Sequence, residues 1–155
     1  MKANIKSNAI RFYSGSDNYS EFSCMSKHPV VIAGTEYPTL EHYYHAQKFI
    51  DLEPVEEILA TNNPFEARRL GQRTDYPIHE DWDVMKEHVM FVGLIHKFKQ
   101  HEWLRTLLLS TGDKELIHHS DRDRYWGQSV TGKGKNRLGI MIMNVRERIK
   151  NGNLI

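Results

Sequence analysis

The pattern of apolar and polar positions changes character near residue 39. Before that point, short apolar runs bounded by Ser, Asp, Asn and Gly predict strands rather than helices. One strand is expected over residues 9–13, and residues 30–37 are expected to form a small hairpin that turns at Ala33-Gly34. The beginning of the chain therefore predicts a small β element.

Beyond residue 39, apolar residues recur at helical spacing, and capping residues, prolines and glycines mark the ends of helices. The predicted helices cover residues 40–50, 55–60, 64–71, 82–100, 103–110 and 137–150. The longest of them is expected to be the central core helix because of its apolar residues Trp82, Met85, Val89, Val92 and Phe98. The predicted fold class is α+β and mainly α: a single compact domain over residues 1–155, its core about 10–150, with a small N-terminal β element packed on a helical core.

Composition and charge narrow the class of protein. The chain has 155 residues, of which 39% are hydrophobic and 26% charged, and 21 Lys and Arg balance 20 Asp and Glu. This balance excludes a protein that binds nucleic acid mainly by neutralising phosphates, but not a local basic pocket. The single cysteine excludes an intramolecular disulfide. No apolar run approaches the roughly 20 residues of a membrane span, and the first residues lack the apolar core of a signal peptide, so we expect a soluble, cytoplasmic protein.

The segment 41–48 gathers several chemically active side chains on one face. At about 100° per residue, Glu41, Tyr44, His45 and Lys48 fall within one arc of a helix. This face is either the wet side of an amphipathic helix with a Glu–His pair, or the wall of a site that carries a carboxylate and an amine. His42 and His45 have no obvious third ligand, so no metal site is expected. The opposite face carries the residues expected in the core, Tyr43, Ala46 and Ile50.

Two later segments carry the remaining candidates. Residues 118–128 mix carboxylates, arginines and large aromatic side chains without a helical or strand period. Such a segment is either a structured loop that aims side chains into a cleft, or a salt-bridged surface loop anchored by Trp126. Residues 132–139 place two glycines and two lysines before the last helix, which is typical both of a phosphate cradle and of a flexible basic loop.

Three segments taken together resemble one protein family. They are residues 37–49, 123–127 and 132–139. Shorter matches accompany them in order from about Phe12 to Ile149, so the likeness covers nearly the whole chain. The chain thus resembles the YbiA-like, or NADAR, N-glycosidases.

The resemblance implies a hydrolase that cleaves the N-glycosidic bond between a ribose or phosphoribose and a heterocyclic base. It implies no metal or organic cofactor. The substrates that it suggests are the phosphoribosylamino-pyrimidine intermediates of riboflavin synthesis and ADP-ribosylated guanine. The expected partner is therefore a small ribosyl or phosphoribosyl compound or an ADP-ribosylated guanine, and not a membrane.

The resemblance also implies three catalytic residues, Glu41, Lys48 and Asp123. Cleavage of a ribosyl C–N bond builds positive charge on the sugar and negative charge on the base, so Glu41 fits a stabilising carboxylate or general base. Asp123 fits a group that orients or protonates the substrate. Lys48 fits an amine that captures the opened sugar as a Schiff base, which requires a lowered pKa. Direct attack by water is the simpler alternative, and both stay open at this point.

The residues expected to bind the substrate are Tyr13, Tyr44, Trp126, Gly127, Lys133, Lys135 and Asn136. Trp126 is expected to stack on the heterocycle, and residues 132–136 are expected to hold phosphate.

One position departs from the family pattern, which usually has Asn-Phe where this chain has Cys24-Met25. If that asparagine reads the substrate, Cys24 cannot replace its amide. If it only ties down a loop, Cys24 is simply a small buried group. Two other functions stay open: a non-catalytic module that binds ADP-ribose or a nucleotide, and a structural or regulatory protein with a relic fold.

Overall fold

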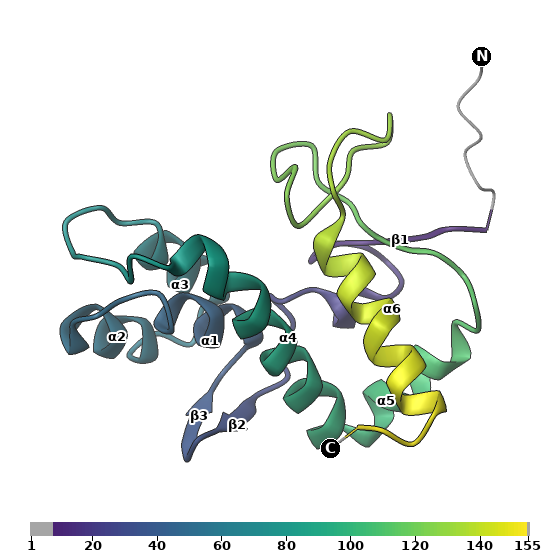
Figure 1. Cartoon of the computed structure of the whole chain (residues 1–155), viewed down its shortest axis with the longest axis horizontal. Helices are drawn as coiled ribbons and strands as arrows, with labels where there is room; N and C mark the ends of the chain where they lie inside the picture. Colours follow the sequence, from purple (N-terminus) through teal and green to yellow (C-terminus); the bar gives the residue numbers. More distant parts are fainter. Residues whose placement is uncertain (1–7, 155) are drawn as a thin grey trace. The chain divides into compact units, whose positions relative to one another are not determined.

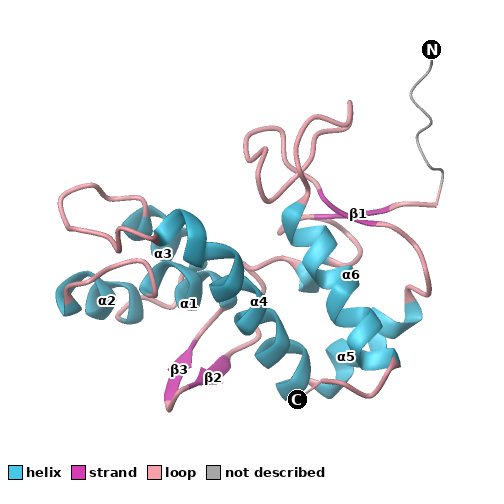
Figure 2. Cartoon of the chain, in the orientation of Figure 1, coloured by secondary structure: helices cyan, strands magenta, loops and turns pink. Residues whose placement is uncertain are grey.

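A computed structural model describes residues 8–154 of the chain (Figure 1). This part is mainly helical with a few short strands, which confirms the predicted α+β, mainly α class (Figure 2). The helices are α1 (Leu40–Ala46), α2 (Leu52–Leu59), α3 (Pro64–Gly71), α4 (Trp82–Gln100), α5 (Glu102–Ser110) and α6 (Arg137–Lys150). The other elements are the strands β1 (Ile10–Phe12), β2 (Val30–Ile32), β3 (Thr35–Tyr37) and β4 (Leu116–His118), and the 3₁₀ turn η1 (Ser20–Phe22).

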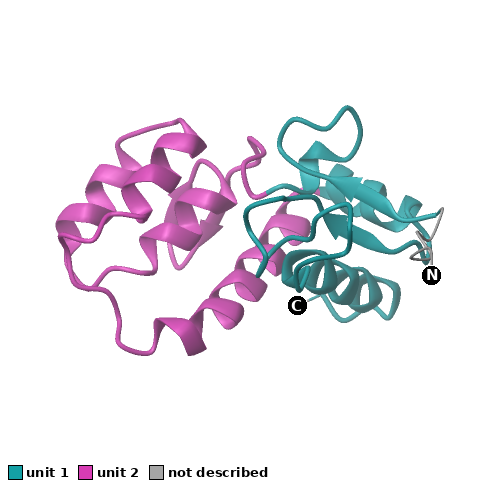
Figure 3. Ribbon diagram, turned by 90° about the horizontal axis from the view of Figure 1, so that it is seen from above, with its two compact units in different colours: residues 1–23, 102–155 teal, residues 24–101 magenta. Residues whose placement is uncertain are grey.

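The chain divides into two compact units, which Figure 3 shows in different colours. Unit 1 contains the described residues before 24 and after 101, and unit 2 contains residues 24–101. The expected organisation of residues 1–155 as a single domain stays a prediction.

Unit 1 is built around a parallel strand pair. Strand β1 pairs with β4, so that Ile10 lies opposite Leu116 and Phe12 opposite His118. Helix α6 packs on β4 and on α5. The side chains buried between these elements are Phe12, Phe22, Leu104, Leu108, Leu116 and Ile142. Sequence analysis missed β4 and began a loop at its last residue, because a three-residue strand is defined by its distant partner and not by a local pattern.

Unit 2 combines a hairpin with four helices. Strands β2 and β3 pair antiparallel as predicted, with Ala33 and Gly34 at φ 51° and 82°. Two successive left-handed residues form the turn whose twist matches that of a two-residue hairpin. Helix α1 packs against α2, α3 and α4. The fully buried side chains of this unit include Leu40, Ile58, Leu94 and Phe98.

The first helix is shorter than predicted, and residues 47–50 lie outside it. Helix α1 ends at Ala46, because the backbone beyond it pairs with a distant segment. Phe49 forms an isolated bridge with Ile78, and the backbone N–H of Ile50 donates to the carbonyl of Pro77 (3.4 Å). Ile50 is consequently 56% exposed, so its predicted place in the core is wrong.

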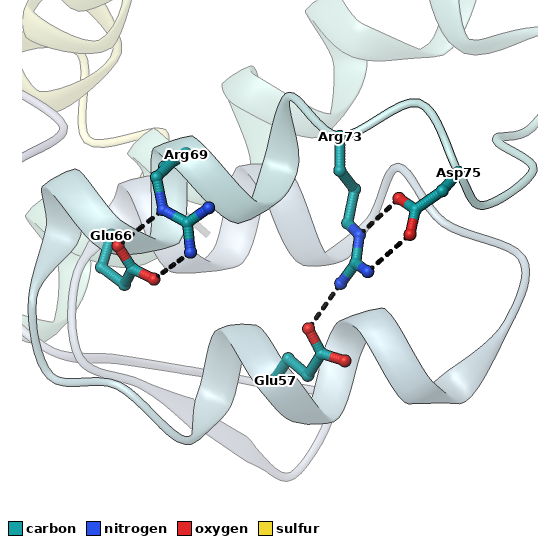
Figure 4. A network of polar contacts seen from close by, with 5 residues as sticks. All are labelled: Glu57, Glu66, Arg69, Arg73 and Asp75. Atoms are coloured by element: carbon teal, nitrogen blue, oxygen red, sulfur yellow. Dashed lines mark hydrogen bonds and ion pairs between the residues drawn. The ribbon is translucent and has the colours of Figure 1, made fainter.

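Ion pairs hold the end of α3 in place, as Figure 4 shows. The Arg73 guanidinium donates to both carboxylate oxygens of Asp75 (2.7 Å each) and reaches Glu57 on α2. Arg69 pairs with Glu66 within α3. Arg73 thus connects α2 with the segment that follows α3.

Helix α4 has the predicted bounds, but its buried face is shifted. Met85 and Val92 are only half-buried, whereas Met90, Leu94 and Lys97 are buried. The Lys97 ammonium reaches this position because it donates to the Ser26 hydroxyl (2.7 Å). Over residues 8–154, neither α4 nor another helix combines the length and apolarity that a membrane crossing requires.

Candidate active site

Helix α1 of unit 2 begins at a firmly bonded cap. The Thr39 hydroxyl accepts the backbone N–H of His42 (3.3 Å), and the Cys24 carbonyl accepts that of Glu41 (3.0 Å). The His42 Nε2–H donates to the Thr61 carbonyl (2.8 Å), which leaves Nδ1 to accept from the Thr39 hydroxyl (2.7 Å). Burial lowers the pKa of His42, so the ring stays neutral and anchors α1 to the segment before α3.

Glu41 and His45 form the predicted pair one helical turn apart. The distance between His45 Nε2 and Glu41 Oε1 is 2.8 Å, and the two side chains are only 9% and 13% exposed. The interpretation of this face as the wet side of a surface helix is therefore wrong, since the pair is largely shielded from water. An interaction between a carboxylate and a hydrogen-bond donor is stronger in such surroundings than at an open surface.

Lys48 follows the end of α1 and points toward α3. Its Nζ donates to the carbonyl of Gly71 (2.8 Å). Burial of the side chain lowers the pKa of Lys48 below its ordinary value of 10.5. A lysine with a lowered pKa has more of the neutral amine that acts as a nucleophile. The direction of this shift is the one that a Schiff-base lysine requires.

Tyr44 lies beside this pair. Its half-buried ring contacts those of His45 and Trp82, each with a centroid distance of 5.2 Å. Unit 2 thus places the predicted Glu41, Tyr44 and Lys48 along one helix and the chain just beyond it. His45, which sequence analysis considered only as part of an ion pair, is the buried member of this group.

Cys24, where the chain departs from the family pattern, faces the core. The residue is 7% exposed, and its Sγ lies 3.8 Å from the sulfur of Met90. Its carbonyl accepts the backbone N–H of Glu41 at the start of α1. Of the two interpretations that the sequence left open, the burial of Cys24 favours the one in which it is simply a small buried group.

A hollow of about 400 Å³ also lies in unit 2. It is lined by Lys27, Pro29, Glu36, Pro38, Thr39 and Asn62. None of the residues expected to act on or bind the substrate is among them.

In unit 1, Asp123 organises the loop that follows β4. Its Oδ1 accepts the backbone N–H groups of Tyr125 (3.1 Å) and Trp126 (2.9 Å). Its own N–H donates to the Ser120 hydroxyl (2.9 Å). Within the described residues, Oδ2 of this half-buried side chain accepts no hydrogen bond from the protein. One carboxylate oxygen of Asp123 thus shapes the loop.

Trp126 is half-buried, and its ring stands nearly perpendicular to that of Tyr125, with centroids 4.9 Å apart. The next residue, Gly127, is buried, and a Cβ there would lie 2.9 Å from the carbonyl oxygen of Asp123. Tight packing within the loop therefore accounts for a glycine at position 127, and its contact with a substrate stays a prediction.

The side chain of Asn136, which is also expected to bind substrate, forms hydrogen bonds with β4. Its Oδ1 accepts the N–H of His118 (2.9 Å), and its Nδ2 donates to the carbonyl of Leu116 (2.9 Å). The side chain is buried and its backbone is left-handed, with φ 50°. Both amide groups are occupied by β4, so we assign Asn136 to holding the glycine-rich segment against this strand.

The basic residues of the same segment lie at the surface. Lys133 and Lys135 are exposed, and Lys135 Nζ lies 5.5 Å from the centroid of the Tyr125 ring. Close packing also shapes this segment, because a Cβ on Gly134 would lie 2.3 Å from the Gly127 carbonyl oxygen. Lys133 and Lys135 therefore extend from a loop whose conformation is constrained by close packing.

Tyr13 is 44% exposed, and its ring lies 5.7 Å from that of His119. The guanidinium of Arg11 reaches His119 Nδ1 (3.4 Å) and the Ser129 carbonyl (3.4 Å). Sequence analysis missed Arg11 and His119. The alternation in β1, where Arg11 stands between two buried residues, is the signal that would have placed it on the outer face of the strand.

The comparisons with known proteins agree with this arrangement of motifs. The family model described as the NADAR domain matches residues 11–150. The chain is 44% identical to N-glycosidase YbiA of Escherichia coli over 140 residues, which is 90% of this chain and 88% of that protein. It is 39% identical over 145 residues to an N-glycosidase of Nostoc punctiforme, covering 92% of this chain and 93% of the other.

A riboflavin biosynthesis protein of Vibrio vulnificus is 35% identical over 150 residues, covering 97% of this chain and 41% of that protein. The NMR structure of E. coli YbiA is similar in fold, with a TM-score of 0.85 and 43% identity over 94% of this chain and 87% of the other. These findings confirm the resemblance seen in the sequence motifs, and the chain belongs to the NADAR domain family.

Proposed function

We propose that this protein is an N-glycosidase that hydrolyses the bond between a ribose or phosphoribose and a heterocyclic base. The observation that carries the proposal is Lys48, an amine with a burial-lowered pKa, one turn from the buried Glu41–His45 pair. The names of the YbiA and Nostoc relatives support the reaction, and the name of the Vibrio relative supports riboflavin-pathway pyrimidines as one substrate class. ADP-ribosylated guanine is the other class, and the expected cytoplasmic location stays a prediction.

The first step of the proposed reaction opens the sugar. In a ribosylamine, the bond from the ring oxygen to C1′ breaks, the ring oxygen takes a proton, and C1′ forms an imine with the base nitrogen. Glu41 stabilises the positive charge that develops at C1′. Its shielded position strengthens this interaction, because little water screens it.

Lys48 then displaces the base from C1′. The neutral amine adds to C1′, its proton passes to the base nitrogen, and the base leaves with the electron pair of the former C–N bond. Water adds to the resulting lysine imine and releases the sugar as its aldehyde, which returns the amine. The sum is the addition of one water molecule across the N-glycosidic bond.

The residues of unit 1 are proposed to hold the substrate. Asp123 is proposed to orient or protonate the substrate, and the half-buried indole of Trp126 is proposed to stack on the heterocycle. Tyr13 offers a second exposed ring. Lys133 and Lys135 supply positive charge for a phosphate.

The proposal is tested by incubating the purified protein with a phosphoribosylamino-pyrimidine and with ADP-ribosylated guanine while free base is measured by chromatography. We expect Glu41→Gln and Lys48→Met to lower kcat by about 100-fold or more, because each removes a reacting group. Lys99→Met removes an exposed lysine of α4 and serves as the matched control.

Base release that is unchanged in both site variants would overturn the assignment of Glu41 and Lys48. Binding of ADP-ribose without release of base from either substrate would instead support the non-catalytic binding module.

A further inference from the structure

We infer that His45 and Gly71 form a positioning device that fixes the Glu41 carboxylate and the Lys48 amine together. The inference rests on the proposed function, since it assigns a purpose to two residues that touch the proposed reacting groups. It is drawn from the contacts among α1, the chain just beyond it and the end of α3, all within unit 2.

The first part of the device is the orientation of the His45 ring. Nε2 lies 2.8 Å from Glu41 Oε1, whereas Nδ1 is buried and has no hydrogen-bond partner among the described residues. A buried N–H without an acceptor is costlier than an unused lone pair, because the donor loses its bond to water outright. The ring proton is therefore on Nε2, and its N–H points at the carboxylate. His45 acts as a directed donor that holds one rotamer of Glu41.

The second part is the space that the ring occupies. A Cβ built on Gly71 would lie 2.1 Å from His45 Nδ1 and 2.3 Å from Cγ. The imidazole thus lies where any other residue would carry its side chain. Gly71 is the last residue of α3 and is not among the glycines with positive φ, so its backbone conformation does not call for glycine. The need for glycine at this position comes instead from the ring of His45.

The third part is the carbonyl of the same glycine. It accepts the Lys48 Nζ at 2.8 Å. Gly71 therefore contacts one reacting group and the partner of the other: its carbonyl accepts the Lys48 amine, and its missing side chain leaves room for the His45 ring that bonds Glu41. This arrangement fixes one side chain of a short helix, and one from the chain just beyond it, against a second helix.

The test separates positioning from mere structural support by its kinetic signature. His45→Gln keeps an N–H donor near the place of Nε2, and His45→Leu removes it. We expect His45→Leu to lower kcat about tenfold or more with KM changed by less than about threefold, and His45→Gln to recover most of kcat. His42→Leu is the matched control, because this buried imidazole of the same helix bonds Thr39 and Thr61 instead of Glu41.

The variant Gly71→Ala tests whether the His45 ring needs the space that the missing side chain of Gly71 leaves. Alanine is favoured over glycine within helices, so a loss of stability must come from the collision with His45. We expect Gly71→Ala to lower both Tm and kcat in the wild-type background. In a His45→Ala background, where the ring is gone, the same change should not lower Tm further.

A measurement without substrate completes the test. The ¹⁵N shifts of the His45 ring near neutral pH should show a protonated Nε2 and an unprotonated Nδ1. Any one of three results would overturn the inference. They are a proton on Nδ1, additive effects of Gly71→Ala and His45→Ala on Tm, and an equal loss of kcat in His45→Leu, His45→Gln and His42→Leu. If the wild-type protein releases no base from either substrate, the proposed function fails. The tautomer of His45 and the Tm values of the single and double variants at Gly71 and His45 still decide whether the ring occupies the space beside Gly71.

Discussion

At the scale of single residues, burial decides which members of α1 carry chemistry. Glu41 and Lys48 are polar groups that the fold shields from water, and each has one defined partner, the ring of His45 and the carbonyl of Gly71. His42 is equally polar, but both of its nitrogens are engaged by Thr39 and Thr61. It therefore fixes the helix and takes no part in the proposed reaction.

The lowered pKa of Lys48 gives a direct titration experiment. After reductive ¹³C-methylation, we expect the Lys48 resonance to titrate below the ordinary lysine value of 10.5. The pKa of Lys48 is lower in the folded than in the unfolded chain, so the unfolded chain binds more protons. The free-energy penalty of burying Lys48 therefore disappears as the pH rises toward 10.5. Titration of Lys48 at 10.5 or above would contradict the shielded environment.

The covalent role of Lys48 has its own test. Borohydride added during turnover reduces a lysine imine to a stable secondary amine, so the mass of the sugar should appear on the peptide that contains Lys48. The adduct should be absent in Lys48→Met. An adduct on another lysine, or none during rapid turnover, would favour direct attack by water on the sugar.

At the scale of elements, local sequence signals predicted the helix ends that interactions between neighbouring residues determine. The Asn63-Pro64 start of α3 follows from a capping side chain, since Asn63 Oδ1 accepts the N–H of Phe65 (2.9 Å), and Gly71 marks its end. Strand β4 and the early end of α1 depend on partners far along the chain, and no local pattern encodes them.

The same limit applies to the candidate site. The spacing of Glu41 and His45 predicted their pairing, because residues four apart on a helix are neighbours. The partner of Lys48 could not be predicted, since Gly71 belongs to another helix. Resemblance suggested Asn136 as a substrate ligand, but a shared motif does not distinguish residues that bind a substrate from residues that hold the loop around it.

Asn136 provides the prediction at this scale. Replacing it with glycine keeps the left-handed backbone and removes two hydrogen bonds to β4, so we expect Asn136→Gly to lower the free energy of unfolding by about 2–3 kcal/mol. Asn136→Ala should cost about 1 kcal/mol more, because an alanine at φ 50° is strained. Urea denaturation measures both values. Equal stability of the alanine and wild-type proteins would contradict the structural role.

At the scale of the whole molecule, the family motifs fall in both units. Glu41, Tyr44 and Lys48 belong to unit 2, whereas Asp123 and Trp126 belong to unit 1. The NADAR domain match spans residues 11–150 and thus includes described residues of each. The near-neutral charge of the chain is consistent with a small ligand held by a few local cations rather than by a broad basic surface.

Binding of a phosphorylated sugar should therefore stabilise the chain through a small number of exposed lysines. A ligand that binds only the folded state at about 100 times its Kd adds about 2.7 kcal/mol of stability, which raises Tm. With ribose 5-phosphate we expect this rise in Lys48→Met, which binds without turnover, and a much smaller rise when Lys133→Glu and Lys135→Glu are added. Both lysines are exposed, so the added changes should leave the Tm of the unliganded protein nearly unaltered. A rise of the same size in the triple variant would mean that the phosphate is held by other residues, because reversing two charges at the true site removes most of the attraction for the anion.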